Sequence, residues 1–150
     1  MRKIHQIMNH LPEVIVPDAD LVKAASVMSE LKIGTLLVAK GNPKVLRPDD
    51  LLGIVTDRDI IVRCIAKGMD PEIFTVSQAM TTPVFYCLDN DDLTAAVKIM
   101  EDRGVRRLAV FSSVTRQLIG LLSLDDIAEE SRKELAGGIL YETSRRKKSA

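Results

Sequence analysis

The 150-residue sequence predicts a mixed α/β (α+β) fold built from two copies of one β-α-β-β-α unit. Three observations support this prediction: an internal repeat, an alternation of strand-like and helix-like hydrophobic patterns, and an aliphatic composition. The chain is 46% hydrophobic but only 3% aromatic, and it has no Trp. Its core must therefore consist of Val, Ile, Leu, Met and Ala, which suits strands packed against helices.

The internal repeat aligns residues 17–38, PDADLVKAASVMSELKIGTLLV, with residues 89–110, DNDDLTAAVKIMEDRGVRRLAV, without a gap. An insertion in the turn-rich residues 40–50, where extra length is tolerated, precedes a second matched part in which Gly53 pairs with Gly120. The repeat divides the chain into a first unit at 7–67, a second unit at 79–135 and a basic C-terminal tail at 136–150.

Both units have the same expected order of elements. The first helix of each unit is expected to begin at an acidic or amide cap, Asp18 or Asn90, and it carries apolar residues at i, i+3, i+4 and i+7. A short helical turn is expected at 75–80. The other expected ranges are 14–16 and 84–87 for the first strand, 36–39 and 108–111 for the second, 51–55 and 118–122 for the third, and 58–67 and 125–135 for the closing helix.

The tail follows a break in the helical pattern. AGGIL at 136–140 interrupts the periodicity, so we expect the closing helix to end near Leu135. The basic cluster at 145–148 then belongs to a solvated, frayed segment, as is usual at chain termini. A tail that contacts phosphate or lipid is the alternative.

Charge and composition exclude several classes of partner. The 21 basic and 21 acidic residues balance, so no global field favours nucleic acid or a membrane surface, and we expect neither partner. The N-terminus lacks the apolar segment of a secretory signal. Cys64 and Cys87 stand without a CxxC motif or His ligands, which favours buried thiols and a cytoplasmic protein. No residue pattern predicts a metal site, and the repeat-matched methionines are interpreted as core residues.

The stretch GIVTDRDI, residues 53–60, contains the most informative polar residues. An aliphatic strand ends at Thr56, and a helical pattern begins around Asp59. Polar side chains at this edge of a strand often bind ligands in α/β proteins, but they also serve as ordinary helix starts. Ser123 and Asp126 repeat the pattern in the second unit.

Together these motifs resemble a pair of cystathionine-β-synthase (CBS) domains over residues 3–135. The resemblance is carried by Asp-x-Leu-x-x-Ala-x-x-x-Met in each first helix, by GVRRLAV at 104–110, and by Gly-x-x-[Thr/Ser]-x-x-Asp in GIVTDRDI and IGLLSLDDIA. It implies two units packed sheet to sheet and a non-catalytic regulatory protein without a catalytic cofactor. The expected ligand contains adenosine: AMP, ADP or ATP first, NAD or S-adenosylmethionine second. The resemblance also implies a homodimer and leaves a regulated partner protein unidentified.

The resemblance implies one ligand site on each side of the cleft between the units, with the terminal Asp of the motif accepting hydrogen bonds from ribose hydroxyls. Site one would combine Thr56, Arg58, Asp59, Thr82, Pro83, Val84, Val105, Arg106 and Arg107. Site two would combine Val14, Val16, Ile33, Gly34, Thr35, Ser123, Asp125 and Asp126.

The two sites differ in the charges available for phosphate. Site one gathers Arg58, Arg106 and Arg107, whose guanidinium forks suit phosphate oxygens, whereas site two has no cation among its expected residues. A phosphorylated adenosine is therefore expected in site one, while site two binds neutral adenosine parts or nothing. On this expectation, Asp59→Ala abolishes nucleotide binding and Asp126→Ala spares it.

Two other functions compete with this interpretation. Asp57-x-Asp59 and the later Asp125-Asp126 superficially resemble haloacid-dehalogenase-like phosphatases, whose first Asp is a nucleophile and Mg²⁺ ligand. The chain is short and lacks their Ser/Thr and Lys motifs, and the repeat explains both Asp pairs together. The other alternative is a CBS pair without a ligand that acts as a dimerisation or protein-interaction module, because a fold does not dictate one function.

Overall fold

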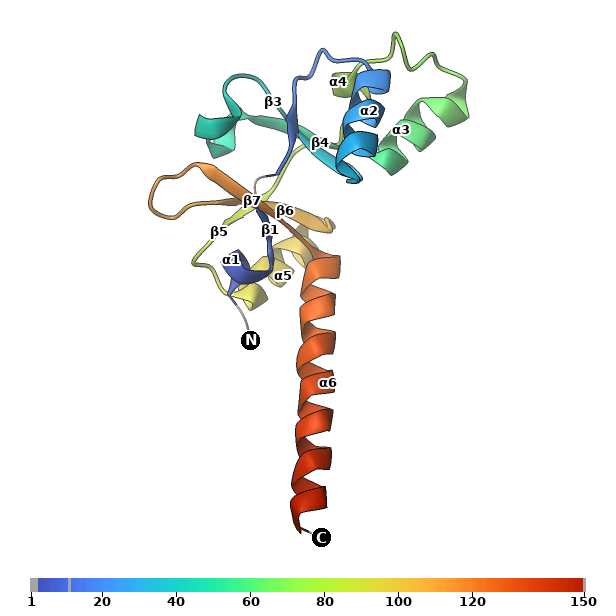
Figure 1. The fold of residues 1–150 in the computed structure, drawn as a ribbon. Helices are drawn as coiled ribbons and strands as arrows, with labels where there is room; N and C mark the ends of the chain where they lie inside the picture. Colours follow the sequence, from blue (N-terminus) through green and yellow to red (C-terminus); the bar gives the residue numbers. More distant parts are fainter. Residues whose placement is uncertain (1–2, 11, 150) are drawn as a thin grey trace.

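The computed structural model describes residues 3–10 and 12–149, with the side chains of 138–149 outside the described part. It contains two sheets, one above the other in Figure 1. The first has the order β2-β3-β4, and the second has the order β1-β7-β6-β5. The strands are β1 Asn9–His10, β2 Val14–Ile15, β3 Thr35–Ala39, β4 Leu51–Thr56, β5 Tyr86–Leu88, β6 Arg107–Phe111 and β7 Leu118–Ser123. The predicted α/β fold with two repeated units is confirmed.

The two sheets share a repeated pairing scheme. In each unit a parallel pair, β2–β3 or β5–β6, is followed by an antiparallel pair, β3–β4 or β6–β7. Two short 3₁₀ turns, Pro43–Val45 and Pro48–Asp50, fill the longer connection between β3 and β4. The inserted residues of the first unit therefore form a surface excursion and leave the sheet intact.

The equivalent helices α2 (Leu21–Leu31) and α5 (Leu93–Arg103) bury the predicted stripe. Leu21, Ala24 and Met28 are buried in α2, and their counterparts are buried in α5. The expected caps at Asp18 and Asn90 are wrong: Asp20 and Asp92 occupy the N-cap positions, two residues later. Asp20 Oδ1 accepts a hydrogen bond from the Lys23 backbone N–H at 2.8 Å, which only this later position allows.

Each unit receives a short helix from the segment that precedes the other unit. The helix α1 (Ile4–Ile7) and Met8 lie in the core of the second unit, where β1 pairs with β7. The helix α4 (Val76–Ala79) lies in the core of the first unit instead. The two cores are thereby connected by two crossing segments, and neither unit completes its core from its own repeat alone.

The closing helices differ in length. The first unit ends with α3 (Asp57–Arg63) and a 3₁₀ turn, Ile65–Lys67, stopped by Gly68 in the left-handed region. In the second unit, α6 runs from Leu124 to Ser149 and extends away from both sheets in Figure 1. The predicted helix end near Leu135 and the frayed tail are therefore wrong. Glycine only weakens a helix, by about 1 kcal/mol per residue, and strong helix formers surround the two glycines.

Candidate ligand-binding cleft

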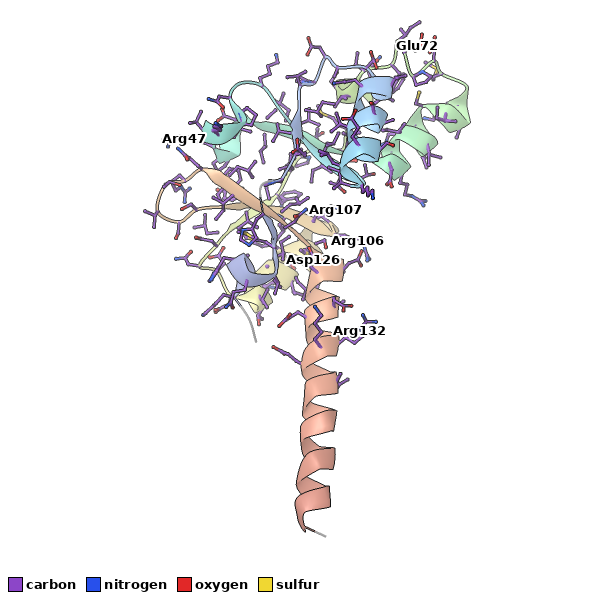
Figure 2. The ribbon with its side chains drawn as sticks, in the orientation of Figure 1. Arg47, Glu72, Arg106, Arg107, Asp126 and Arg132 are labelled. Carbon is purple, nitrogen blue, oxygen red and sulfur yellow. The ribbon has the colours of Figure 1, made fainter. Side chains whose placement is uncertain are left out.

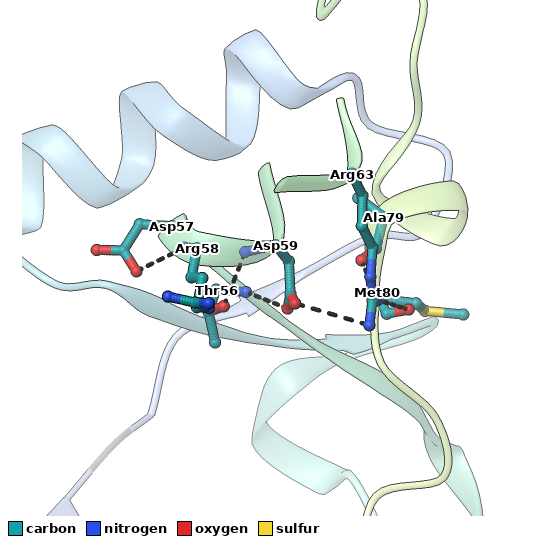
Figure 3. Close-up of polar contacts among 7 residues, drawn as sticks. All are labelled: Thr56, Asp57, Arg58, Asp59, Arg63, Ala79 and Met80. Carbon is teal, nitrogen blue, oxygen red and sulfur yellow. Dashed lines mark hydrogen bonds and ion pairs between the residues drawn. The ribbon is translucent and has the colours of Figure 1, made fainter. Parts of the chain in front are cut away.

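Thr56 and Asp59 form a reciprocal cap at the start of α3. The Asp59 backbone N–H donates to Thr56 Oγ1 at 3.1 Å, and the Thr56 N–H donates to Asp59 Oδ2 at 2.9 Å. Asp59 Oδ1 also lies 3.9 Å from the Arg63 guanidinium, which donates to the carbonyls of Ala79 and Met80 (Figure 3). The expected site-one acid therefore holds the helix start and, through Arg63, the α4 segment.

Ser123 and Asp126 form the same cap at the start of α6. The Asp126 N–H donates to Ser123 Oγ at 3.0 Å, and the Ser123 N–H donates to Asp126 Oδ2 at 3.1 Å. A carboxylate offers about four acceptor positions, so the cap leaves Asp126 able to accept further hydrogen bonds. A structural role and a ligand role are therefore compatible at this position.

The second unit's cap opens into a cavity of about 590 Å³ that both units line. The first unit contributes Ile33, Gly34 and Thr35, and the second contributes Ser123, Asp125 and Asp126. Six of the eight residues expected for site two thus lie together. The cavity is also lined by residues that sequence reasoning did not assign to site two: Ile7, Met8, Asn9, Pro12, Glu13, Leu31, Arg107 and Leu121.

Arg107 changes the electrostatics expected for this cavity. It was assigned to site one, but it lines the cavity together with Ser123 and Asp126. The antiparallel register of β6 and β7 pairs Arg107 directly with Ser123, so the two residues stand side by side at one sheet edge. Figure 2 shows Arg107 and Asp126 near the start of α6. The cavity that the site-two residues line therefore also has a cation in its wall, which the expected set of site-two residues did not include.

Arg106 forms an ion pair with Asp125. Its guanidinium donates to Asp125 Oδ1 at 3.0 Å, and both side chains are mostly exposed, at 64% and 79%. An ion pair this exposed contributes about 0–1 kcal/mol to stability. Arg106 therefore balances an acid at the rim of the cavity, and the three arginines expected in site one do not act as one group.

The remaining site-one residues lie apart from this cavity. Arg58 is exposed on the first turn of α3, and Thr82 and Pro83 are exposed in the segment between α4 and β5, joined by a cis peptide bond. Val84 is half-buried in the same segment, and Val105 packs against the second core.

Two residues expected in site two also lie elsewhere. Val14 belongs to β2 and does not line the cavity. Val16 lines a separate cavity of about 640 Å³ with Lys40, Thr75 and Ser77. The residues that sequence reasoning missed come mainly from residues 7–13. Part of this segment, α1 and β1, packs against the second unit.

The described residues also bear on two other kinds of function, metal binding and membrane insertion. Within the part of the chain that the structure describes, no three His, Cys, Asp or Glu side chains are grouped so that they could hold a metal ion. In the same part, none of the helices combines the length and the apolar character needed to cross a membrane.

Sequence comparison agrees with this architecture. The CBS domain family matches the chain twice, at residues 4–65 and 76–133. The chain therefore belongs to the CBS domain family, and its two repeats form a tandem CBS pair.

Proteins similar to this chain occur in bacteria and archaea. Hypoxic response protein 1 of Mycobacterium tuberculosis is 30% identical over 128 residues, which is 85% of this chain and 84% of that protein. The CBS domain-containing protein YhcV of Bacillus subtilis is 28% identical over 96% of both chains. The uncharacterized protein MK0525 of Methanopyrus kandleri is 29% identical, and the match spans 75% of this chain but only 54% of that protein.

A solved structure confirms the fold. The crystal structure of Hypoxic Response Protein I with two coordinated zinc ions aligns with a TM-score of 0.66 at 29% identity, covering 85% of this chain and 98% of that chain.

Proposed function

We propose that this CBS pair is a non-catalytic regulatory module that binds an adenosine-containing ligand in the cavity between its units. The observation that carries the proposal is the presence of Arg107 and Asp126 in one cavity lined by both units. The volume of about 590 Å³ lies within the range of small-molecule sites. AMP, ADP and ATP are the favoured ligands, with NAD and S-adenosylmethionine as alternatives.

The lining residues suit the parts of such a ligand. The Asp126 carboxylate can accept hydrogen bonds from two ribose hydroxyls, and such charge-assisted bonds are strong. The Arg107 guanidinium can bind phosphate oxygens in a fork. Ile7, Met8 and Ile33 supply apolar surface for a base. This assignment moves the preferred site from Asp59 to Asp126, because the available cation lies there.

Ligand occupancy has a structural route to regulation. A ligand held by Thr35 of one unit and Asp126 of the other would favour the arrangement of units that it binds best. The surface offered to a regulated partner protein would then depend on the ligand. Small-angle scattering profiles that differ with and without ligand are the expected result, and identical profiles would count against this route.

A thermal-shift screen tests the binding proposal. AMP, ADP, ATP, NAD, S-adenosylmethionine and adenosine are added at millimolar concentrations, because a ligand specific for the native state raises the melting temperature by mass action. Arg107→Ala is expected to remove the advantage of phosphorylated ligands over adenosine. Arg106→Ala is the matched control and is expected to keep that advantage. No shift with any ligand would overturn the proposal.

A second candidate function is homodimerisation without a ligand. Exposed apolar side chains on α3 and in the segment that follows it favour this candidate. They are Ile61, Val62, Ile65, Met69 and Ile73, of which Ile73 is 76% exposed and Ile61 58%. Exposed apolar side chains that gather into a patch mark interaction sites. Sedimentation equilibrium of the wild type and Ile61→Lys tests it: loss of a dimer in the variant supports an interface here, and an unchanged dimer argues against one.

A further inference from the structure

The first unit has a cavity of its own, apart from the one proposed for the adenosine ligand. Its volume of about 640 Å³ lies within the range of small-molecule sites. Its walls come from the segment after β2, the loop after β3, the strand β4 and the helix α4 with the residue before it. None of its described lining residues also lines the cavity at Arg107 and Asp126. The two cavities are therefore separate.

This cavity lies where a contact of the second unit has no counterpart in the first. In the second unit, Asp89 Oδ1 accepts a hydrogen bond from the Ser113 backbone N–H at 2.9 Å, which ties the end of β5 to the loop after β6. The matched residues of the first unit are Pro17 and Gly41, and both line the cavity. Pro17 has no side-chain acceptor, and a Cβ added at Gly41 would meet nothing within 4 Å. The first unit thus lacks this tie, and the space stays open.

The wall on the side of α4 is held by backbone hydrogen bonds. The Ser77 N–H donates to the Pro17 carbonyl at 2.9 Å, and the Val76 N–H donates to the Ala19 carbonyl at 2.8 Å. The hydroxyl oxygens of Thr75 and Ser77 lie 3.1 Å apart, and both residues line the cavity. A hydroxyl has one donor and two acceptor positions, so Ser77 can bind a ligand group besides Thr75.

Two opposite charges line the cavity without being paired. Asp18 and Lys40 are both exposed, and neither side chain forms an ion pair or a hydrogen bond with the described part of the chain. The matched residues of the second unit are Asn90 and Ser112, so both charges are particular to the first unit. A ligand that carries a carboxylate for Lys40 and an ammonium group for Asp18 would complement them.

Apolar side chains form another part of the wall. Val16 is 49% exposed and Leu52 is 37% exposed, and Met80 is half-buried. Contact with an apolar group of a ligand would remove this surface from water, which is favourable. The flexible side chain of Met80 can adapt to the shape of such a group. The cavity therefore combines an apolar wall with a few polar groups, as small-molecule sites do.

We propose that this cavity binds a free α-amino acid with a large apolar side chain. Lys40 binds the carboxylate of the amino acid, and Asp18 binds its ammonium group. Val16, Leu52 and Met80 contact its side chain. This site does not depend on the adenosine site, so the two proposals can fail separately.

Nuclear magnetic resonance titration of the full chain tests the site. L-phenylalanine and L-leucine are added at millimolar concentrations, beside the corresponding amines and acids that lack one of the two charged groups. We expect saturable shifts of the backbone amide signals of Asp18, Lys40 and Ser77 with the amino acids, and affinity several-fold weaker for the analogues. No saturable shift with either amino acid, shifts confined to the cavity at Arg107 and Asp126, or equal affinity for the analogues would each overturn the proposal.

Charge-removing variants test the two binding groups. Lys40→Met and Asp18→Asn are each expected to bind the amino acid several-fold more weakly. Lys44→Met and Asp49→Asn are the matched controls, because both positions are exposed in the same loop and do not line the cavity. They are expected to keep the affinity of the wild type. Losses as large in the controls, or unchanged binding in both test variants, would overturn the proposal.

Two further measurements keep this result distinct from other effects. The amide spectrum of each variant shows whether it is folded. AMP is expected to bind Lys40→Met as it binds the wild type, because Lys40 does not line the cavity at Asp126. A loss of AMP binding in Lys40→Met would show that the two cavities are not independent and would overturn the assignment of a separate site.

Discussion

Glycine and methionine form a repeated contact between the exchanged segments and the sheets. A Cβ at Gly53 would lie 2.6 Å from Met80 Sδ, and a Cβ at Gly120 would overlap Met8 in the equivalent position. Met8 is buried, and Met80 packs against the first core. Any larger residue at these glycines would displace the segment that crosses from the other unit. The close approach of a methionine to a strand glycine therefore explains both repeat-matched residues, and it occurs once in each unit.

Gly120→Ala tests this contact. The added Cβ would also lie 3.1 Å from the Asn9 carbonyl oxygen in β1, which is held by its pairing with β7. We expect a loss of about 1–3 kcal/mol in the free energy of unfolding, as is usual for overpacking. Gly34→Ala is the matched control, because its Cβ would meet the exposed side chain of Asp57, which can move. Urea denaturation measures both, and an equal loss in the two variants would contradict this account.

The thiol of Cys87 has a raised pKa. Burial, followed by the negative charge of Asp91, raises the pKa of its thiol from 9.0 to about 12. The native thiol therefore stays protonated at pH 8 and should be alkylated by iodoacetamide far more slowly than in urea, as located by mass spectrometry. Because the folded pKa is the higher one, this stabilising contribution is complete below pH 9 and is lost as the pH rises towards 12. Rapid native alkylation of Cys87 at pH 8 would show that the thiol is accessible.

The starts of α3 and α6 carry the residues that hold each helix and also the residues expected to bind the ligand. The caps of α3 and α6 have nearly the same hydrogen bonds. What differs is the neighbouring strand: Thr35 pairs with Thr56, whereas Arg107 pairs with Ser123. The cation at the second cap comes from the strand register, which sequence periodicity alone does not fix. This is the physical reason why Arg107, which was expected in site one, lines the cavity with the site-two residues.

The length of α6 leads to a prediction about the helix content of its C-terminal part. Glycine inside a helix costs about 1 kcal/mol relative to alanine, and Gly137 has open space around it. Gly137→Ala is therefore expected to raise the helix content of the C-terminal part and to leave the stability of the two cores nearly unchanged. Circular dichroism at 222 nm and hydrogen exchange check the two effects. A fall in helix content would mean that residues 136–149 are not helical in solution.

At the scale of the whole molecule, the sequence predicted the architecture because the same pattern of apolar residues and motifs occurs in both units. Matched positions such as Met28 and Met100 are buried in matched helices. Every strand except β1, for which no strand was expected, lies within two residues of its expected range. The exchange of α1 and α4 was not predicted, because the pairing of a segment with a distant unit leaves no local pattern. Ile7 and Met8 were missed in the cavity for the same reason.

Because α1 packs against the second unit, the cavity proposed for the ligand lies where elements of both units meet. The cavity is lined by α1, by the start of β3 and by the start of α6, so one ligand would contact elements of both units. Asp126 is central to this account because it belongs to the cavity, whereas Asp59 has the same cap without Arg107 beside it. Removal of either carboxylate costs a similar part of a helix cap, about 1 kcal/mol. Asp59→Ala additionally loses the contact of Asp59 with Arg63, so the folding of both variants is checked beside the binding.

The most direct test is calorimetric titration of AMP into the wild type, Asp126→Ala and Asp59→Ala at the same temperature. We predict binding of one AMP per chain to the wild type and to Asp59→Ala. In Asp126→Ala we predict affinity reduced at least 10-fold, with both variants still folded by circular dichroism. Binding that is lost in Asp59→Ala and retained in Asp126→Ala would contradict the assignment of the ligand to the cavity at Arg107 and Asp126.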